Sequence, residues 1–442
     1  MKKILAVLLC LTTVLAMGAS FALADDNVIN LYSFTVEVPE MVDKFLELHP
    51  DFGYTFNSTV VATTDGLYQP ALDQALVSGG ADAPDIYCAE SAFVLKYTQG
   101  DMASFAASYA DLGIDIDAAL KAADIAQYSA DIGTRPSDGQ VVGLGYQATG
   151  GAFIYRRSIA IDVWGTDDPA VIATKVGPGL DKFMEAAEEL KAKGYSAVSS
   201  AGDIWHMIEN SSDKGWIVDD ELYIDPAREL FLDVHKQLRD NDYFNDTNSW
   251  GEAWYGDFRD AGAKKVFGWF GPAWLINYVM AGNVGGSKIG EGTFGDFAVC
   301  EPPIGFFWGG TWVLANKDSN KKEAIGQFID WITLQSDEQG LQYFWANGTL
   351  NGEGGTKDTV ASGTVMSISG GELEFLGGQN MFDVFVPANQ FANGKNLTQY
   401  DERINTLWQD YVRQYAEGNL SRETAIAGFK QAVSDEFGIE AP

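Results

Sequence analysis

Short β-rich runs alternate with amphipathic helical patterns along most of this chain. The run at 27–34 precedes a helical pattern that extends through Leu48, and a second run at 54–62 precedes another helical pattern at 67–77. Strand, helix and parallel strand form one repeating unit, so this alternation predicts an α/β fold with mostly parallel sheets. Ligand sites in such sheets lie at the carboxyl ends of the strands.

The start of the chain has the pattern of a secretory signal peptide. Met-Lys-Lys precedes an apolar run to about Met17, and the small-x-small sequence Ala22-Leu23-Ala24 follows. We predict a signal peptide at residues 1–24, because the apolar run is shorter than the roughly 20 residues of a membrane-spanning helix. Removing 24 of 442 residues leaves 418. That length exceeds what one hydrophobic core usually holds, so we expect an exported, soluble protein with two domains.

The net charge excludes two classes of partner. The sequence has 29 Lys and Arg against 62 Asp and Glu, which gives a formal net charge of -33. A field of this sign repels nucleic acids and anionic membrane surfaces, so we expect neither as a partner. A solvated acidic surface accounts for the charge, and a cationic ligand is the alternative interpretation.

The cysteines leave a choice between a disulfide and free thiols. Cys10 lies in the predicted signal peptide, but Leu9 precedes it where a lipid-attachment motif has a small residue, so we expect no lipid anchor. Cys88 and Cys300 are the remaining cysteines. They form either one pair or two unrelated buried thiols, and the second interpretation is favoured, since a chain of this size buries enough core without disulfides.

The sequence has no recognisable catalytic or metal-binding motif. Its three histidines, His49, His206 and His235, have neither metal-ligand nor catalytic-triad spacing. A nucleophile elbow, a phosphate-binding glycine loop and a C-x-x-C motif are also missing. We therefore expect no metal, no cofactor and no enzymatic activity. A pair of carboxylates for glycoside hydrolysis stays an alternative, because 62 acidic residues always include some pair at a suitable spacing.

Aromatic residues give the positive signal for function. The chain contains 12 Trp, 18 Tyr and 26 Phe, and several Trp lie beside Gly, Asp or Asn. Four stretches share this feature: DIWH (203–206), SWGEAWYGD (249–257), FGWFGPAW (267–274) and FFWGGTW (306–312). Sugars present an apolar C–H face ringed by hydroxyl groups, so carbohydrate sites combine a stacking ring with carboxylates and amides. The stretches have that composition, although core packing is the alternative for any single Trp.

Seven longer motifs occur in a specific order along the chain: LYSFTVEVPEMVDKF, GGADAPDIYCAE, GYQATGGAFIYRR, FGWFGPAW, FWGGTWVLANKDSNKKEAIGQFIDWIT, FLGGQN and NLSRETAIAGFKQAV. In order and spacing they resemble the extracellular solute-binding proteins (family 1) of carbohydrate ABC transporters, a group that includes maltodextrin-binding proteins. The resemblance covers nearly all of the chain after the signal peptide. It implies a type II periplasmic-binding-protein-like fold, in which two α/β lobes, each a mostly parallel sheet flanked by helices, are joined by hinge crossings.

The resemblance also implies how the chain is divided and what it does. The N-terminal lobe would comprise residues 25–146 and 304–346, and the C-terminal lobe residues 147–303 and 347–442. Crossings are expected near 146–153, 297–303 and 345–352. A monomer would close on an oligosaccharide and deliver it to the permease subunits of an importer. The expected location is the periplasm, with the outer face of the cell membrane as the alternative.

The resemblance implies ligand contacts from residues that follow predicted strands, lie in the aromatic stretches, or belong to the GYQATGGAFIYRR and FLGGQN motifs. The candidates are Phe34, Glu37, Asp65, Tyr68, Asp85, Glu90, Gln147, Asp203, Trp205, Trp254, Trp269, Trp274, Trp308, Trp312, Gln379 and Asn380. For Asp85, capping a turn is the alternative role. Two other functions stay open at this stage: a polyamine-binding protein of the same fold, because carboxylates and Trp faces bind amines, and a secreted glycoside hydrolase.

Overall fold

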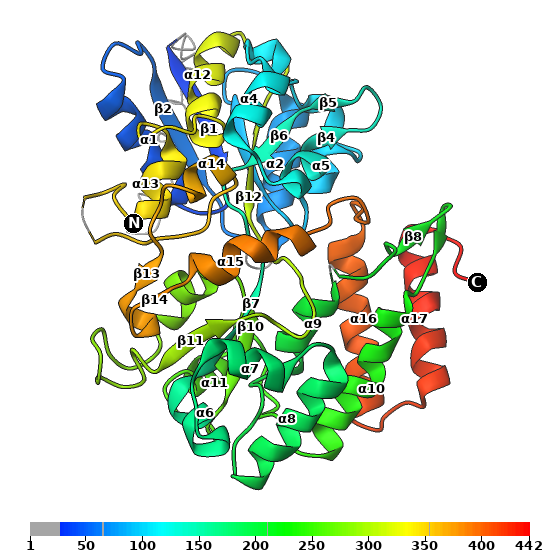
Figure 1. Ribbon diagram of the computed structural model, residues 1–442. Coiled ribbons are helices and arrows are strands. Elements are labelled where there is room, and N and C mark those ends of the chain that lie inside the picture. The colour runs from blue at the N-terminus through cyan, green and yellow to red at the C-terminus, as the bar shows by residue number, and fades with distance from the viewer. Residues whose placement is uncertain (1–26, 64–65, 210, 353) are drawn as a thin grey trace, which may run out of the picture.

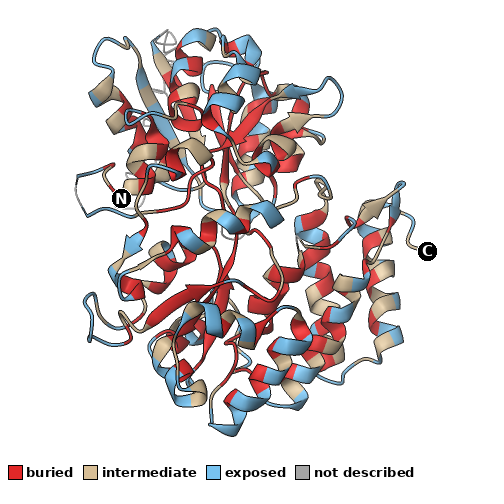
Figure 2. Cartoon of the chain, viewed as in Figure 1, coloured by how far each residue is buried: buried red, intermediate tan, exposed pale blue. Residues whose placement is uncertain are grey.

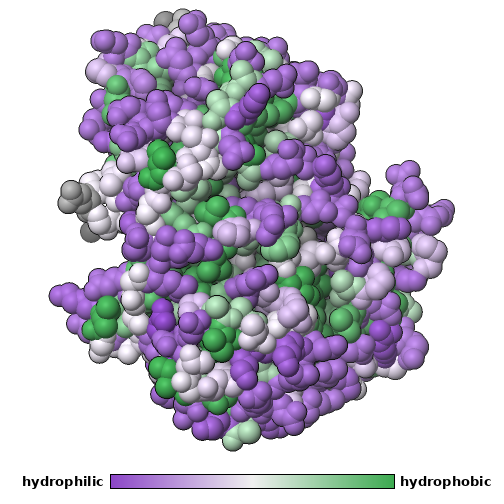
Figure 3. Space-filling model, viewed as in Figure 1, coloured by the Kyte–Doolittle hydropathy of each residue, from purple (hydrophilic) through white to green (hydrophobic). Residues whose placement is uncertain are grey.

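The computed structural model of the chain describes residues 27–63, 66–209, 211–352 and 354–442, which form two lobes (Figure 1). The predicted signal peptide and the candidate Asp65 lie outside the described residues. Within these ranges, no helix combines the length and the apolar character needed to cross a membrane. Figure 3 shows hydrophilic residues over most of the visible face of both lobes, as expected for a solvated acidic surface.

The N-terminal lobe contains a five-stranded sheet. Its strands, in spatial order, are β2 (Thr55–Val60), β1 (Val28–Ser33), β3 (Ile86–Glu90), β12 (Thr311–Ala315) and β6 (Gly143–Gly145). β1 pairs in parallel with β2 and β3, whereas β12 is antiparallel to both β3 and β6. The helices of this lobe are α1 (Glu37–Leu48), α2 (Tyr68–Ser78), α3 (Val94–Thr98), α4 (Ile116–Ala123), α5 (Gln127–Gly133), α12 (Lys322–Thr333), α13 (Leu341–Asn347) and α14 (Gly363–Met366).

The C-terminal lobe contains a three-stranded sheet in which β7 (Ala152–Arg156) lies between β10 (Gly268–Gly271) and β11 (Phe297–Cys300). Both pairings are antiparallel, and single parallel bridges between residues 196 and 266 and between 198 and 244 extend the sheet. The helices of this lobe are α6 (Arg157–Trp164), α7 (Pro169–Val176), α8 (Leu180–Ala192), α9 (Ala201–Glu209), α10 (Pro226–Asp240), α11 (Glu252–Asp257), α16 (Asp401–Ala416) and α17 (Arg422–Phe437).

Several short elements complete the chain. Three two-stranded ribbons pair β4 with β5, β8 with β9 and β13 with β14. A π-helix at Leu275–Met280 follows β10, and α15 (Phe382–Ala388) lies between the two lobes in Figure 1. The ribbons and 3-10 turns are β4 (Thr134–Arg135), β5 (Gln140–Val141), β8 (Ile217–Val218), β9 (Glu221–Leu222), β13 (Glu372–Leu373), β14 (Gln379–Asn380), η2 (Ala103–Phe105), η3 (Ala110–Leu112), η5 (Glu374–Leu376) and η6 (Asn389–Phe391).

Each sheet has one strand that runs against its neighbours, and in both lobes it is the strand that follows a crossing. β7 starts where the chain arrives from the N-terminal lobe, and β12 starts where it returns. A strand that begins at the edge of its sheet nearest the other lobe runs away from that edge. Strands that end at the same edge run toward it, so the two are antiparallel. The ladder around β7 therefore differs from the predicted, mostly parallel sheet.

The crossing segments lie side by side. Residues 146–151 connect β6 to β7, and residues 301–310 connect β11 to β12. The Gly151 N–H donates to the Phe306 carbonyl at 2.9 Å, and the Trp308 N–H donates to the Thr149 carbonyl at 3.1 Å. Each crossing thus supports the other through backbone hydrogen bonds.

The third passage between the lobes comes later than expected. The Ser362 hydroxyl donates to the Ala123 carbonyl at 2.7 Å, and the Thr364 hydroxyl donates to the Ala122 carbonyl at 2.9 Å. Both acceptors belong to α4, so the chain is still in the N-terminal lobe at α14 and leaves after it. The expected crossing at 345–352 is therefore too early, and the other lobe boundaries stay predictions.

The inner strands of both sheets are buried almost throughout, as Figure 2 shows, whereas the edge strand β2 is half-buried to exposed. Along β12, Trp312 and Leu314 pack into one apolar cluster, whereas Val313 and Ala315 pack into another. The thiols of Cys88 and Cys300 are buried in their sheets and free, which confirms the favoured interpretation of two unrelated thiols. Burial raises the pKa of Cys88 to about 12, so this thiol is protonated at neutral pH.

Candidate ligand-binding site

A cavity of about 760 Å³ lies between the lobes, at the carboxyl ends of β1, β2 and β3. This volume is within the usual range for small-molecule sites. Its lining combines aromatic rings, carboxylates, amides and hydroxyl groups. The side chains of these kinds are Phe34, Phe93, Trp250, Trp274, Tyr278, Trp308, Trp345, Glu37, Glu40, Glu90, Glu402, Gln147, Asn351, Thr35, Thr63, Thr311 and Thr356.

Strand direction explains which residues reach this cavity from the N-terminal lobe. Phe34 follows the last residue of β1, and Glu90 is the last residue of β3. α1 begins at Glu37, so Glu37 and Glu40 both lie in its first turn, where the helix dipole favours negative charge. The short loop between β1 and α1 thus brings a ring and two carboxylates to one side of the cavity.

Three tryptophans form an aromatic wall, which consists of Trp250, Trp274 and Trp308. The rings of Trp250 and Trp274 are nearly parallel, with centroids 6.2 Å apart and an interplanar angle of 9°. Trp308 meets Trp274 edge to face at 4.6 Å. Trp250 is 50% exposed and lines the cavity, so part of its ring is accessible from the space inside.

The crossing at 301–310 holds this wall in place. Gly309 and Gly310 have φ of +76° and +108°, a backbone conformation that residues with a Cβ rarely adopt. A Cβ at Gly309 would also lie 3.1 Å from Nε1 of Trp274, which donates a hydrogen bond to the Trp308 carbonyl at 2.9 Å. Behind the wall, the His206 ring stacks on Trp308 at a centroid distance of 3.5 Å.

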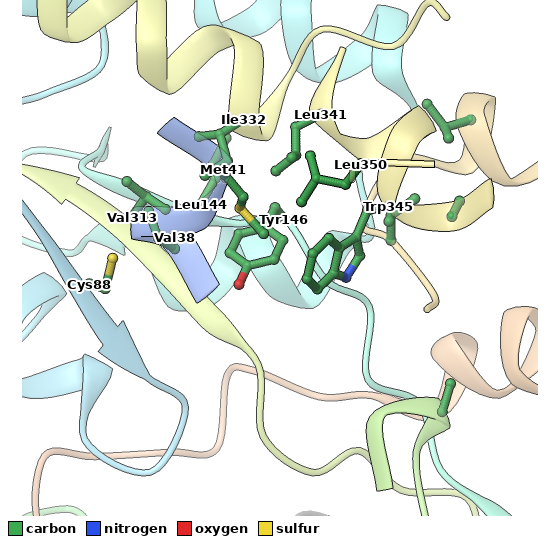
Figure 4. Packing of buried hydrophobic residues seen from close by; sticks show 14 of the residues in the cluster. Val38, Met41, Cys88, Leu144, Tyr146, Val313, Ile332, Leu341, Trp345 and Leu350 are labelled. Atoms are coloured by element: carbon green, nitrogen blue, oxygen red, sulfur yellow. The ribbon is translucent and has the colours of Figure 1, made fainter. Parts of the chain in front are cut away.

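Glu37 connects three parts of the molecule at one side of the cavity. Its carboxylate accepts hydrogen bonds from the hydroxyl groups of Tyr146, in the first crossing, and Tyr278, in the π-helix of the C-terminal lobe. Burial raises the pKa of Glu37, and the nearby Glu40 acts in the same direction. Figure 4 shows Tyr146 beside Trp345, whose ring it meets at 90° with a centroid distance of 6.2 Å.

Two further carboxyls near the cavity have strongly raised pKa values. Burial raises the pKa of Glu90 to about 7, although the Ser91 hydroxyl and the Ala92 N–H each donate to its carboxylate at 3.0 Å. Burial and the charge of Glu37 raise the pKa of Asp358 to about 7, and the Gln147 amide donates to this carboxylate at 3.2 Å. Neutral donors therefore satisfy the oxygens without supplying positive charge.

The structure brings together six of the sixteen candidates: Phe34, Glu37, Glu90, Gln147, Trp274 and Trp308. Four other tryptophans are at most 1% exposed, and none of them lines the cavity, which corrects their assignment as stacking platforms. These are Trp205, Trp254, Trp269 and Trp312. Trp312 Nε1 donates to the Ser129 carbonyl at 3.0 Å in the core of the N-terminal lobe, and Trp269 packs against Phe258 at 4.8 Å.

Two polar candidates in the N-terminal lobe have structural roles instead. Asp85 precedes β3, so it lies at the end of the strand opposite to Glu90. There it accepts hydrogen bonds from the Asn30 N–H at 2.8 Å and from the Lys321 ammonium at 2.7 Å. The Tyr68 hydroxyl donates to the Cys88 carbonyl at 2.6 Å, and its side chain is buried.

Three polar candidates in the C-terminal lobe also bond within the protein, away from the cavity lining. Asp203 accepts from Nε1 of Trp254 at 3.0 Å and from the Ser200 N–H at 2.8 Å, at the start of α9. The Gln379 amide pairs with both backbone groups of Val299 at 2.8 and 2.9 Å. Asn380 accepts from the Phe382 N–H at 3.1 Å at the start of α15.

Several lining residues were not among the candidates: Glu40, Phe93, Trp250, Tyr278, Trp345 and Glu402. Trp250 belongs to the SWGEAWYGD stretch and directly precedes Gly251, so its position in a turn was a usable signal. No local sequence pattern predicts that Tyr278 and Trp345 line the cavity, since only the fold brings their segments there. Among the described residues, no group of three or more His, Cys, Asp and Glu is placed to hold a metal ion.

Comparisons with known proteins agree on one fold. A family model described as bacterial extracellular solute-binding protein matches residues 33–339. A solved structure titled extracellular solute-binding protein family 1 is 19% identical, with a TM-score of 0.72, covering 92% of this chain and 99% of that one. None of the curated protein sequences matches this chain significantly.

Two further solved structures belong to sugar-binding proteins. The galacto-N-biose/lacto-N-biose I-binding protein of an ABC transporter from Bifidobacterium longum, in complex with lacto-N-biose, is 17% identical; its TM-score is 0.68, covering 94% of this chain and 98% of that one. The sugar-binding protein MalE from Xanthomonas citri is 14% identical; its TM-score is 0.66, covering 92% and 96%. These likenesses confirm the predicted two-lobed α/β fold.

Proposed function

The chain belongs to the bacterial extracellular solute-binding protein family, and on this basis we propose that it captures an oligosaccharide between its lobes. In this proposal the protein acts as a monomer outside the cytoplasm, in the periplasm, and delivers its ligand unchanged to the permease subunits of an ABC importer. The cavity between the lobes is the ligand site, and the wall of Trp250, Trp274 and Trp308 is its stacking surface.

The aromatic wall is the observation that carries the proposal. An open indole face binds the apolar C–H face of a sugar ring, and the hydroxyl groups at the edge of that ring need hydrogen-bond acceptors and donors. The cavity supplies both, because Trp250 is half exposed and Gln147, Glu37 and Glu90 line the same space. A volume of about 760 Å³ holds more than one sugar ring.

Calorimetric titration of the purified protein against a panel of plant and storage oligosaccharides tests this function. We expect one class of sugar to bind, to change the Trp fluorescence and to raise the melting temperature. At a hundredfold excess over Kd, binding should raise the free energy of unfolding by roughly 2.7 kcal/mol. Chromatography after overnight incubation should recover the sugar intact. If no sugar of the panel binds, carbohydrate binding is contradicted. Steady hydrolysis of a sugar would indicate a glycoside hydrolase.

A further inference from the structure

The cavity between the lobes is lined by acidic residues and by no basic ones among the described residues. Glu37, Glu40, Glu90 and Glu402 contribute carboxylates to its surface, and Asp358 lies directly behind Gln147. Within the described chain, none of these five forms an ion pair with Lys or Arg. The ligand site therefore concentrates negative charge without a counter-charge from the protein.

The carboxylates form two groups. On one side, the charge of Glu37 makes Asp358 harder to ionise, and the charge of Glu40 does the same to Glu37. On the other side, the charges of Glu402 and Glu209 contribute to the raised pKa of Glu90. A ligand that spans the cavity meets negative charge at more than one point.

The hydrogen-bond partners of these groups are neutral. Tyrosine hydroxyls bond Glu37, a serine hydroxyl and a backbone N–H bond Glu90, and the Gln69 amide donates to Glu402 at 2.9 Å. Withdrawing the Glu90 carboxylate from solvent without a positive charge beside it is costly, and it raises the pKa of Glu90 to about 7. A neutral sugar would add hydrogen bonds to these oxygens and leave their charge uncompensated.

The aromatic wall is suited to the same kind of ligand. The face of an indole ring attracts a cation as well as a C–H surface, and Trp250 offers a half-exposed face beside Trp274 and Trp308. The net charge of -33 acts in the same direction, because it draws cations toward the protein. Two independent features of the cavity, its carboxylates and its accessible aromatic rings, thus favour a positively charged ligand.

We propose that the ligand of this cavity carries at least one protonated amine, held between the carboxylates and the aromatic wall. The proposal rests on the proposed function, and it narrows the ligand class from oligosaccharides in general to those with amino groups. A linear polyamine has the same recognition chemistry, so the test has to separate the two sources.

Calorimetric titration with a matched pair of probes tests the proposal. A β-1,4-linked glucosamine trimer and cellotriose have the same linkage and length, and they differ in an amino or a hydroxyl group on each ring. We expect the glucosamine trimer to bind about tenfold or more tightly than cellotriose at low salt, and the difference to shrink in 0.5 M salt. Spermidine, as a third probe, presents amines without a sugar.

Two variants locate the effect in the cavity. Glu90→Gln keeps the shape of the side chain and removes its charge, so it should weaken binding of the glucosamine trimer about tenfold more than it weakens binding of cellotriose. Asp51→Asn is the matched control, because Asp51 is exposed and precedes β2, at the opposite end of the sheet. It removes one charge from the protein as a whole and should change neither affinity.

The outcomes separate the proposal from the function on which it rests. Equal binding of the two trimers, or a preference for cellotriose, overturns the amine requirement and leaves oligosaccharide capture intact. Tight binding of spermidine with no binding of either trimer supports the amine requirement and contradicts the carbohydrate. No binding of any amine-bearing probe overturns the amine requirement whatever the neutral sugars do.

Discussion

Trp250 enters the cavity from a backbone with φ of +67°, a conformation that bulky residues rarely adopt. Replacing it with Gly should remove the ring without adding backbone strain, because Gly adopts positive φ freely. We expect Trp250→Gly to weaken ligand binding by about 1–3 kcal/mol, the scale of one aromatic contact, and to change the free energy of unfolding by less than about 1 kcal/mol. Titration and denaturant unfolding of the same variant check both values.

Trp312 lies two residues from the glycine pair of the same stretch, yet its ring is fully buried. Trp312→Ala should lower the free energy of unfolding by about 3–5 kcal/mol, because the change leaves a cavity and an unpaired Ser129 carbonyl. Binding by the protein that remains folded should be near normal. Weakened binding with unchanged stability would instead indicate that Trp312 contacts the ligand.

The contrast between these two residues shows what the sequence could and could not predict at this scale. Composition identified FFWGGTW and SWGEAWYGD as stretches that supply ring faces, and each stretch does contribute one lining Trp, Trp308 and Trp250. The choice within a stretch depends on local geometry. Trp312 lies on a central strand with both faces covered, and Trp254 lies in α11 on the buried side. Periodicity cannot separate an open ring from a packed one in such apolar runs.

At the scale of elements, β3 has a structural carboxylate, Asp85, just before its start and a carboxylate that lines the cavity, Glu90, at its end. Asp85→Asn removes the partner of the Lys321 ammonium, at the junction of β3 with the segment before α12, where both side chains are largely buried. We expect a loss of about 3 kcal/mol in the free energy of unfolding with ligand affinity unchanged. Chemical denaturation and titration measure the two effects.

Glu90→Gln is the matched variant at the other end of the same strand. Burial already favours the neutral form of this carboxyl, so removing its charge should leave the free energy of unfolding unchanged or raise it at pH 8. Opposite results for the two variants, with Asp85→Asn tolerated and Glu90→Gln unfolding the protein, would contradict this division of roles.

Element order, and the direction of β1, β2 and β3, were accessible from the sequence, whereas the antiparallel strands β7 and β12 and the contacts between distant elements were not. The alternation of strands and helices predicts β1, β2 and β3 and places Glu90 at the cavity end. Once strand direction is known, Asp85 at the start of β3 is excluded from that end. Tyr278 in the π-helix and Glu402 in α16 have no sequence signal for the site, since each reaches the cavity through packing between segments remote in the chain.

At the scale of the whole molecule, buried carboxyls without cationic partners make stability depend on pH. Burial raises the pKa of Glu90, Asp203 and Asp358 to about 7 and that of Asp401 to about 6. In the unfolded chain these groups ionise near pH 4, so between pH 4 and 7 the folded state binds more protons than the unfolded state. Their contribution to stability is therefore present at low pH and lost as the pH rises through 7.

We expect the ligand-free protein to melt at a higher temperature at pH 5.5 than at pH 8, by on the order of 5 °C. Repulsion among the negative charges of a chain of net charge -33 also lowers the melting temperature as the pH rises. His235 opposes the trend, because burial lowers its pKa to about 4 and its contribution is lost as the pH falls below 6.5. Calorimetric scans across this pH range check the balance, and a melting temperature that rises toward pH 8 would contradict it.

Closure of the lobes gives the last prediction. The Tyr278 hydroxyl, from the C-terminal lobe, donates to Glu37 in the N-terminal lobe, and Tyr146 in the first crossing bonds the same carboxylate. Tyr278→Phe keeps the ring and removes this one bond between the lobes, so the ligand-free protein should populate a more open arrangement with a larger radius of gyration in X-ray scattering.

Saturating ligand should restore the compact form of Tyr278→Phe, because a ligand that binds both lobes shifts the population toward closure. Tyr195→Phe is the matched control, since the Tyr195 hydroxyl bonds Asp162 within the C-terminal lobe. It removes a surface hydrogen bond of the same kind without affecting the contact between the lobes. If the two variants scatter identically to the unaltered protein, Glu37 acts only on the ligand and the lobes are held together by the crossings and the packing around them.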